Sequence, residues 1–333
     1  MAIENTPPSP SDEFQRLTDP YRHELQVHCY RFLGSLFDAE DALQETLLRA
    51  WRRLDSLHEQ SSLRAWLYRI ATNVCLDLIK KGKPRSLPTA LYPPADPQDP
   101  LPLPVLDPVW LEPLPDEYLS SQVPGPEARY DARESVTLAF LAVLQLLPGR
   151  QRAVLILRDV LGWKADEVAG LLDISVAAAN SALQRARATM DKHRSDWAHS
   201  MRLQAGDAQL ETLLARYRQA WESADPDGLV SLLREDATLS MPPTPVWFLG
   251  RPAVAAFYGS LLSSQETGGR FRLRAVRANG CPAFATYQRT GDQSYRPVSL
   301  QLLVIEQYQI VQIITFLVND SRLFEAFGLP VSL

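Results

Sequence analysis

The chain has 333 residues, of which 46% are hydrophobic, so it is long enough to bury two or three separate cores. Its 34 basic and 39 acidic residues give a formal charge of −5, which excludes a uniformly basic nucleic-acid-binding protein. No apolar stretch reaches the roughly 20 residues needed to cross a bilayer, and the first residues lack the basic start and apolar core of a secretion signal. We therefore expect a cytoplasmic protein that does not contact membranes.

The cysteines give no sign of a metal site or a disulfide framework. Cys29, Cys75 and Cys281 are too far apart in sequence for metal-ligand spacing, and their number is odd. We expect three buried thiols, no metal and no cofactor.

The N-terminal part is predicted to be a leader followed by a helix. Residues 1–13 contain Pro7, Pro8 and Pro10 among small polar residues, and we interpret them as disordered. Apolar residues at helical spacing then predict a helix over 14–36. His28 falls on the apolar face of that helix, where a core histidine is the simplest interpretation because the sequence offers no partner at metal-ligand spacing.

Two amphipathic helices are predicted within residues 38–81, and their exposed faces carry opposite charges. In the first helix, Leu43 and Leu47 mark the buried face, and the opposite face is acidic. The second helix follows Ser62 as N-cap, and its free face is mostly basic. An acidic face beside a basic face suggests two different macromolecular partners, although two solvated faces of a helical bundle would give the same pattern.

These two helices resemble conserved region 2 of the extracytoplasmic-function group of sigma-70 RNA polymerase sigma factors. The resemblance rests on the patterns DAEDALQETLLRAW and SSLRAWLYRIATNVCLDLIKK. It implies that the acidic helix binds core RNA polymerase, and that the following loop and helix melt and read the promoter −10 element. The residues implied to bind polymerase are Asp38, Asp41, Gln44 and Glu45. The residues implied to bind −10 DNA are Ser56, His58, Ser61, Arg69, Asn73, Asp77, Lys80 and Lys81. A flipped base needs a polar pocket and a separated strand needs cations, so this set is chemically suitable.

Residues 84–126 are predicted to be an acidic linker with polyproline character, because they contain half of the 26 prolines. The patch VLDPVWLEPLPDEYL places large apolar side chains in this linker, which suggests that Trp110 is an anchor on polymerase or on the protein's own domains. A simple tether is the alternative. The resemblance to sigma factors implies that the linker passes through the RNA-exit path of the polymerase.

Residues 127–200 are predicted to be helical again, with helices over 127–147, 150–160, 164–172 and 176–194. The last two helices flank a tight turn that ends at the N-cap Ser175, which describes a helix-turn-helix whose second helix can enter a major groove. This stretch resembles sigma region 4, which reads the promoter −35 element. The residues implied to bind −35 DNA are Ser175, Asn180, Ser181, Gln184, Arg185 and Arg187. Spacing places Leu183 and Ala186 in the core instead.

Residues 205–328 are predicted to form an additional domain with helices first and strands afterwards, which favours an α+β cone with a curved antiparallel sheet. The runs ADPDGLVSLLREDATLSMPP and GRPAVAAFYGSLL resemble the SnoaL-like polyketide cyclase domains, which share the ketosteroid-isomerase cone. The domain has no histidine and no acid pair at the spacing of a catalytic dyad, so we expect no catalytic residues. The candidate ligand-pocket residues are Trp221, Trp247, Phe248, Tyr258, Tyr287 and Phe316. Ordinary core packing is the alternative for each of them.

The sequence therefore predicts a multidomain sigma factor: an all-α region 2 bundle (14–83), the linker (84–126), an all-α region 4 helix-turn-helix (127–200) and the C-terminal cone (205–328). The expected partners are core RNA polymerase, promoter DNA and a small-molecule ligand of the cone, which is expected to regulate transcription initiation in cis. A cone-fold enzyme with a DNA-binding leader and a ligand-responsive DNA-binding repressor are the two alternatives. The acidic face with Asp41, Gln44 and Glu45 separates these functions, because only a sigma factor needs it.

Overall fold

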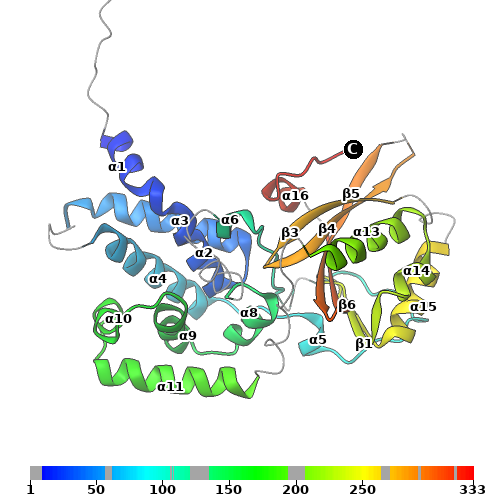
Figure 1. The fold of residues 1–333 in the computed structure, drawn as a ribbon. Helices are drawn as coiled ribbons and strands as arrows, with labels where there is room; N and C mark the ends of the chain where they lie inside the picture. Colours follow the sequence, from blue (N-terminus) through cyan, green and yellow to red (C-terminus); the bar gives the residue numbers. More distant parts are fainter. Residues whose placement is uncertain are drawn as a thin grey trace, which may run out of the picture. The chain divides into compact units, whose positions relative to one another are not determined.

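The computed structural model describes residues 10–56, 62–105, 107, 109–120, 135–193, 207–263, 271–291, 294–318 and 321–333. These residues form two units, which we treat separately (Figure 1). Within the described ranges, the helical unit includes 10–84, 117–120 and 143–191, and the sheet unit includes 85–116, 135–142 and 207–333.

The first half of the helical unit contains four helices. They are α1 (Pro10–Thr18), α2 (Arg22–Leu33), α3 (Leu36–Arg52) and α4 (Leu63–Lys81). The helix predicted over 14–36 is thus wrong in two respects, since it begins at Pro10 and is interrupted by a 3-10 turn at Asp19–Tyr21. Pro20 explains the interruption, because proline lacks an amide hydrogen and disfavours helical backbone in the residue before it. Gly34, with φ of 68°, ends α2, and the Ser35 hydroxyl caps α3 by accepting a hydrogen bond from the Asp38 amide (3.0 Å).

The second half of the helical unit is the predicted helix-turn-helix and the helices before it. Its helices are α6 (Glu117–Ser120), the end of α8 (Leu138–Gln145), α9 (Gly149–Leu155), α10 (Ala165–Leu172) and α11 (Val176–Lys192). The helix predicted over 127–147 is shorter, because α8 starts at Leu138 after a turn, and 121–134 lie outside the described residues. The helix predicted over 150–160 changes to a π-helical turn at Ile156–Val160.

A buried arginine joins the two halves of the helical unit. The guanidinium of Arg152 is only 2% exposed and donates hydrogen bonds to the carbonyl oxygens of Phe32 at the end of α2, Gln145 at the end of α8 (3.0 Å) and Leu147 (3.3 Å). It also donates to the Gln145 side-chain oxygen (3.0 Å). Burial lowers the pKa of Arg152 to about 10, so the group is still charged at neutral pH. Backbone carbonyls that have no hydrogen-bond partner within their own helix thus share one cationic donor, the Arg152 guanidinium.

The sheet unit has a six-stranded sheet in the order β2-β1-β6-β5-β4-β3. The strands are β1 (Leu233–Ser240), β2 (Trp247–Leu249), β3 (Phe271–Ala278), β4 (Cys281–Arg289), β5 (Tyr295–Glu306) and β6 (Gln309–Leu317). The expectation of a wholly antiparallel sheet is wrong at one place, because β1 runs parallel to β6 with Thr238 opposite Gln312. The other pairs are antiparallel.

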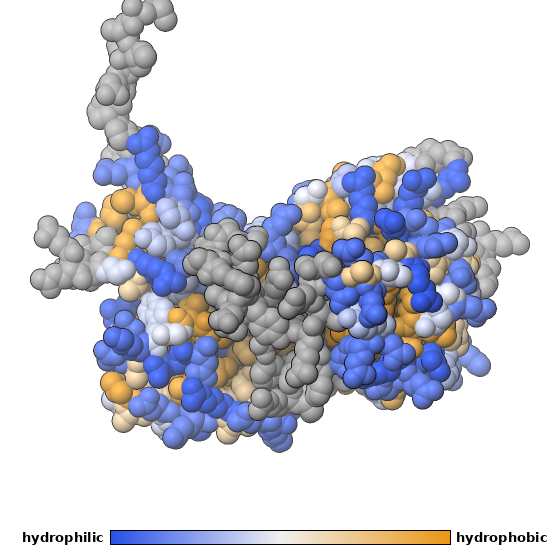
Figure 2. All heavy atoms as spheres, in the orientation of Figure 1, coloured by the Kyte–Doolittle hydropathy of each residue, from blue (hydrophilic) through white to orange (hydrophobic). Residues whose placement is uncertain are grey.

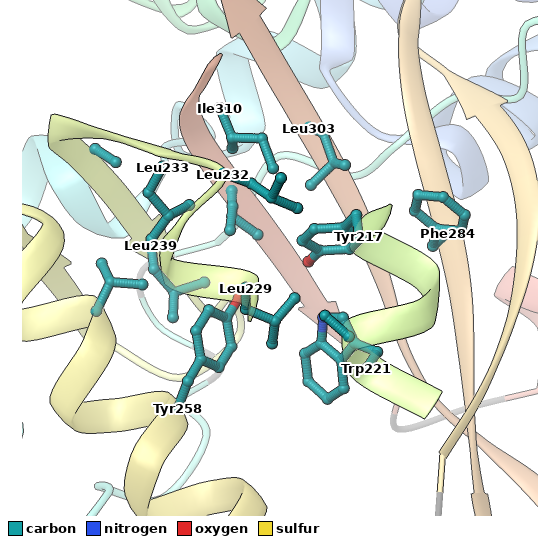
Figure 3. Close-up of a cluster of buried hydrophobic side chains, with 14 of the residues drawn as sticks. Tyr217, Trp221, Leu229, Leu232, Leu233, Leu239, Tyr258, Phe284, Leu303 and Ile310 are labelled. Carbon is teal, nitrogen blue, oxygen red and sulfur yellow. The ribbon is translucent and has the colours of Figure 1, made fainter. Parts of the chain in front are cut away.

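Helices cover one face of this sheet and enclose the main core. They are α13 (Ala208–Glu222), α14 (Pro226–Val230) and α15 (Arg251–Ser263). Figure 3 shows Tyr217 and Trp221 of α13 and Tyr258 of α15 meeting aliphatic side chains of the strands, such as Leu303. The short helix α16 (Arg322–Ala326) packs on the other face through Phe324 against Tyr287.

We predict that His28 makes the stability of the helical unit depend on pH. His28 is fully buried between α2 and α4, and its Nε2 lies 2.9 Å from the Thr72 hydroxyl. Burial, followed by the charges of Arg31 and Arg64, lowers the pKa of His28 to about 3. Below pH 6.5 the unfolded chain therefore binds a proton that the folded chain excludes, and stability falls toward pH 3 by up to about 1.4 kcal/mol per pH unit.

The measurement is amide hydrogen exchange in α2 and α4 between pH 6.5 and 4.5, with His28→Gln as the variant that keeps a partner for Thr72 but does not titrate. The opening free energies of the variant should depend less on pH. Parallel pH profiles for the two proteins would show that His28 is not the group responsible.

Candidate nucleic-acid and polymerase interfaces

The acidic residues of α3 lie on one exposed stripe of the helix. Asp41 and Gln44 are exposed, and Asp38 and Glu45 are half-buried. The opposite face, with Ala39, Leu43 and Leu47 among others, is buried in the helical unit. Leu48 and Trp51 extend the acidic stripe toward the end of α3 and remain 43% and 40% exposed. The Trp51 ring packs edge-on against Phe14 of α1, with 5.2 Å between the ring centroids.

The basic residues of α4 also share one exposed face. Arg69, Asn73, Lys80 and Lys81 are exposed, and Asp77 is half-buried between them. Ser56 ends a 3-10 turn after α3, and His58 and Ser61 lie outside the described residues. The structure thus brings one cationic and polar stripe together on α4.

Arg49 connects the acidic stripe of α3 with the basic stripe of α4. Its guanidinium binds Glu45 one turn earlier (2.6 Å) and Asp77 across the helix pair (3.5 Å). Asp77 also approaches Lys80 at 3.6 Å. The sequence analysis missed Arg49, although its i,i+4 spacing from Glu45 was a usable signal. Because Asp77 is neutralised by two cations, it weakens the positive potential of the stripe less than an isolated carboxylate would.

The second helix of the helix-turn-helix, α11, presents the residues expected to face DNA. The Ser175 hydroxyl accepts a hydrogen bond from the Ala178 amide (3.1 Å), and Asp173 adopts a left-handed conformation in the turn. The exposed side chains include Asn180, Gln184 and Arg185, and Figure 2 shows a mainly hydrophilic surface over this helix. The predicted core residues Leu183 and Ala186 are buried, together with Ala179, Ala182 and Met190.

Three residues of the predicted −35 set, Ser181, Arg185 and Arg187, bind other side chains of the helical unit. Ser181 is half-buried and accepts a hydrogen bond from Arg185 (2.8 Å). Arg187 makes a two-pronged ion pair with Asp159 of the π-helical turn, at 2.8 and 2.7 Å. This pair fixes α11 against the turn that precedes the helix-turn-helix.

The six candidate pocket residues of the cone do not converge on one cavity. Trp221, Phe248 and Tyr258 lie in the main core, whereas Tyr287 packs on Phe324 and donates to the Pro330 carbonyl (2.9 Å). Trp247 lies on β2, and Phe316 lies on β6 in register with Leu300. Two cavities in the sheet unit, of about 480 and 340 Å³, are lined by none of the six.

Polar atoms nevertheless meet inside the main core. The Tyr217 hydroxyl donates to Gln301 (2.6 Å), and Figure 3 shows the Tyr258 hydroxyl and the Trp221 indole nitrogen also turned toward the middle of the cluster. Tyr217 was not among the predicted pocket residues. Among the described residues, no group of three His, Cys, Asp or Glu side chains is placed to hold a metal ion. Likewise, no helix in the described ranges is long and apolar enough to cross a membrane.

The proline-rich linker is bound along the sheet unit, which differs from the extended tether predicted from composition. The Trp247 indole donates to the Tyr92 carbonyl (2.7 Å), and the Ala95 amide donates back to the Trp247 carbonyl (2.8 Å). Further along, the Val105 amide donates to the Pro243 carbonyl (3.0 Å). We call residues 85–116 the strap. Composition could not reveal these contacts, because backbone groups on the sheet unit make most of them.

Trp110 is an anchor within the strap itself. Its side chain is 7% exposed, and its indole nitrogen donates to the Val105 carbonyl (2.9 Å). The Arg85 guanidinium binds the Trp110 carbonyl (2.6 Å) and Glu112 (3.3 Å). These contacts are all within the strap, so anchoring of Trp110 on polymerase or on another domain stays a prediction.

Asn279, at the tip of the β3–β4 hairpin, holds two separate segments. Asn279 and Gly280 both have positive φ, 53° and 78°, as a two-residue hairpin turn requires. The Asn279 side chain accepts from the Leu114 amide (2.8 Å) and donates to the Val136 carbonyl (2.6 Å). Asp116 adds an ion pair with Arg277 (3.1 Å) and accepts from the Gly280 amide (2.7 Å). The end of the strap and the residues just before α8 are thus fixed to one turn.

Known families match all three parts of the chain. Residues 17–85 match the model of sigma-70 region 2, residues 137–190 that of sigma-70 region 4, and residues 214–322 that of the SnoaL-like domain. ECF RNA polymerase sigma factor SigG of Mycobacterium tuberculosis strain H37Rv is 45% identical over 339 aligned positions, which cover all of this chain and 89% of the relative. The chain belongs to the ECF sigma factors.

Other relatives match the chain over different lengths. ECF RNA polymerase sigma factor SigW of Bacillus subtilis is 28% identical and matches 56% of the chain, while 90% of SigW itself is covered. The crystal structure of the ECF sigma factor SigJ of M. tuberculosis has the same fold over 95% of the chain and 99% of SigJ, with a TM-score of 0.58 and 23% identity.

The family assignment confirms the predicted general function. This sigma factor directs transcription initiation, and sigma factors bind core RNA polymerase and promoter DNA without being enzymes. The two alternatives, a cone-fold enzyme and a ligand-responsive repressor, are therefore excluded as the main function. The predicted architecture is also confirmed, with helical region 2 and region 4 parts and a C-terminal sheet with helices.

We predict that two substitutions of Asn279 release different segments. Asn279→Gly keeps the positive φ and the backbone bond to Leu114 but loses both side-chain bonds, so amide exchange should quicken about tenfold near residues 111–114 and 135–139. Asn279→Asp keeps the acceptor for Leu114 and places an oxygen against the Val136 carbonyl. It should therefore quicken exchange only near 135–139. Exchange that is equally slow in all three proteins would mean that the side chain is not what holds these segments.

Proposed function

We propose that this ECF sigma factor binds core polymerase through the acidic stripe of α3, reads the −10 element with α4 and the loop before it, and reads the −35 element with α11. We further propose that its C-terminal SnoaL-like domain regulates initiation in cis by retaining the strap. The observation that carries the regulatory part is the row of backbone hydrogen bonds between the strap and the sheet unit.

The polymerase assignment is supported by the chemistry of the α3 stripe. Exposed Asp41 and Gln44 stand beside partly exposed Leu48 and Trp51, so the stripe combines charge with large apolar side chains. Protein interfaces typically place an aromatic or aliphatic anchor beside a polar rim. The acidic residues would orient a basic partner surface, and Trp51 would supply buried contact area.

The −10 assignment is supported by the order of side chains along α4. Arg69 and Asn73 lie one turn apart on the exposed face, and Lys80 and Lys81 end the helix. The amide and the guanidinium can bind base edges or stack, while the lysines act as point charges on phosphates. Arg49 reduces the repulsion between Asp77 and the DNA strand by pairing with that carboxylate.

The −35 assignment is supported by the exposed face of α11. Asn180 and Gln184 are one turn apart, and an amide side chain can form two hydrogen bonds with adenine in the major groove. Arg185 can form the corresponding pair with guanine. Arg187 is oriented by Asp159, which suits a phosphate contact at a fixed position.

The regulatory proposal follows from a competition for the strap. The resemblance to sigma factors implies that the linker passes through the polymerase, and it cannot do so while its backbone is bonded to Trp247, Pro243 and Asn279. The C-terminal domain would therefore act as an internal competitor of the polymerase for residues 85–116.

We predict that reversing two charges of the α3 stripe abolishes polymerase binding. The double variant Asp41→Lys/Glu45→Lys places like charges against a basic partner, which should weaken binding of core polymerase by about 100-fold or more. Fluorescence anisotropy with purified core polymerase measures this change. The matched control is Glu211→Lys/Asp227→Lys, which reverses two exposed charges of the sheet unit and should bind normally. Equal affinities of the two variants would contradict the polymerase assignment of α3.

We predict that weakening the strap raises transcription. In Trp247→Phe/Asp116→Asn, the strap loses the indole bond to Tyr92 and the ion pair with Arg277, so run-off transcription at limiting core polymerase should rise severalfold. Tyr308→Phe is the control, because it removes a side-chain hydrogen bond of the sheet unit, to Asp207, that does not involve the strap. If amide exchange shows that the strap is released while transcription stays unchanged, the proposed competition does not operate.

A further inference from the structure

We propose that the sheet of the C-terminal domain carries a binding site for a small organic cation, an amine with an apolar body, on the face opposite its helix-covered core. The site is the cavity of about 480 Å³ that is lined by β1, β6 and β5, by Cys281 at the start of β4, and by residues 137–139, which form its roof. Its volume is within the usual range of small-molecule sites.

The alternation of side chains along the strands places this cavity on the second face. On β5, Leu303 points into the main core, whereas Leu302 and Val304 line the cavity. On β6, Ile313 likewise belongs to the main core, whereas Ile314 lines the cavity. The cavity is therefore distinct from the interior of the cone, which Tyr217, Trp221 and Tyr258 fill.

The floor of the cavity is apolar and buried. Leu302 and Ile314 are opposite each other in register and are 1% and 2% exposed. Cys281 borders the floor at the start of β4, and its burial raises the pKa of the thiol to about 12, so the thiol is neutral. A ligand body that covers this floor should consequently be hydrocarbon.

The polar end of the cavity favours a cation over an anion. Arg234 is paired with both Asp236 and Glu306, and its distance to Glu306 is 2.6 Å. Arg234, Asp236 and Glu306 are the charged residues of the lining, and their formal charges sum to −1. The Arg234 hydrogen bond also lowers the pKa of Asp236, which keeps this carboxylate ionised. An ammonium group can join the two carboxylates, whereas a carboxylate ligand would have to displace one of them from Arg234.

The residues that form the roof of the cavity connect the proposed site with region 4. Thr137, Leu138 and Ala139 belong to the first turn of α8 and the residue before it, and the bond between Asn279 and Val136 holds them on the sheet. Farther along α8, Gln145 is bound by Arg152 in the helical unit. A bound amine would stabilise the start of region 4 on the C-terminal domain. This consequence rests on the proposed cis regulation, whereas the site itself does not.

The test uses the full-length chain with three probes of matched shape, namely benzylamine, benzyl alcohol and benzoate. Isothermal titration should give the order amine, then alcohol, then benzoate, with the amine favoured over benzoate by about tenfold or more. Hydrogen exchange should slow at residues 137–139 and 234–238 when benzylamine is present. The absence of amine binding at millimolar concentration, or protection elsewhere in the chain, would overturn the proposal.

Glu306→Gln is the decisive variant, because it changes the charge of the lining from −1 to 0 while keeping its shape. The preference for amine over benzoate should fall about tenfold. Glu325→Gln is the control, because it neutralises a carboxylate on α16 outside the cavity and should leave the preference unchanged. Val304→Phe should block all three probes. If this variant does not fold, the comparison of the two glutamine variants still decides.

Transcription provides a separate readout. If benzylamine binds at this site with the expected selectivity but does not change run-off transcription, the site is retained and its coupling to region 4 is rejected. If the amine does not bind, the site is rejected even where transcription responds to the strap variants.

Discussion

The hydrogen bonds of the Asn279 side chain are the constraint on which much of the sheet unit depends. Asn279 lies at a hairpin tip with φ of 53°. Its side-chain oxygen accepts a hydrogen bond from the strap, and its side-chain nitrogen donates one to the residues before α8. The same amide therefore fixes the linker between regions 2 and 4 at one end and the entry to region 4 at the other. A clamp of this kind needs both a donor and an acceptor, and the carboxamide of asparagine supplies them on two separate atoms.

In the helical unit, a charged side chain connects segments that are far apart in the sequence. Arg152 collects three backbone carbonyls from segments more than 100 residues apart in sequence, and its guanidinium presents enough donors for all of them. Lysine could not replace it, because an ammonium has three donors at one point and cannot span separate helix ends. Region 2 and the beginning of region 4 consequently share one buried polar centre.

Local patterns in the sequence predicted the parts of the fold that depend on local contacts. The helices over 38–81 were predicted correctly because their apolar residues recur at helical spacing. The break at Pro20 was overlooked although proline signalled it. The parallel pairing of β1 with β6 and the binding of the strap could not be predicted, since both join segments that are far apart in the sequence. For the sites, the resemblance to sigma factors selected side chains of α3, α4 and α11, many of which are exposed. It gave no indication of Arg49 or Asn279, each of which connects separate segments.

The carbonyl cluster around Arg152 also has a consequence for the geometry of promoter binding. Two promoter elements that are read by α4 and α11, as proposed, would be separated along the duplex by about 3.4 Å for each intervening base pair. In the helical unit, α4 packs against both α9 and α10, and Arg152 bonds directly to the end of α2. A chain that contacts both elements through α4 and α11 has to give up this packing. Under the proposed reading of the promoter, opening the Arg152 cluster would be a conformational cost of binding duplex DNA, and a partner that held the two regions apart would lower that cost.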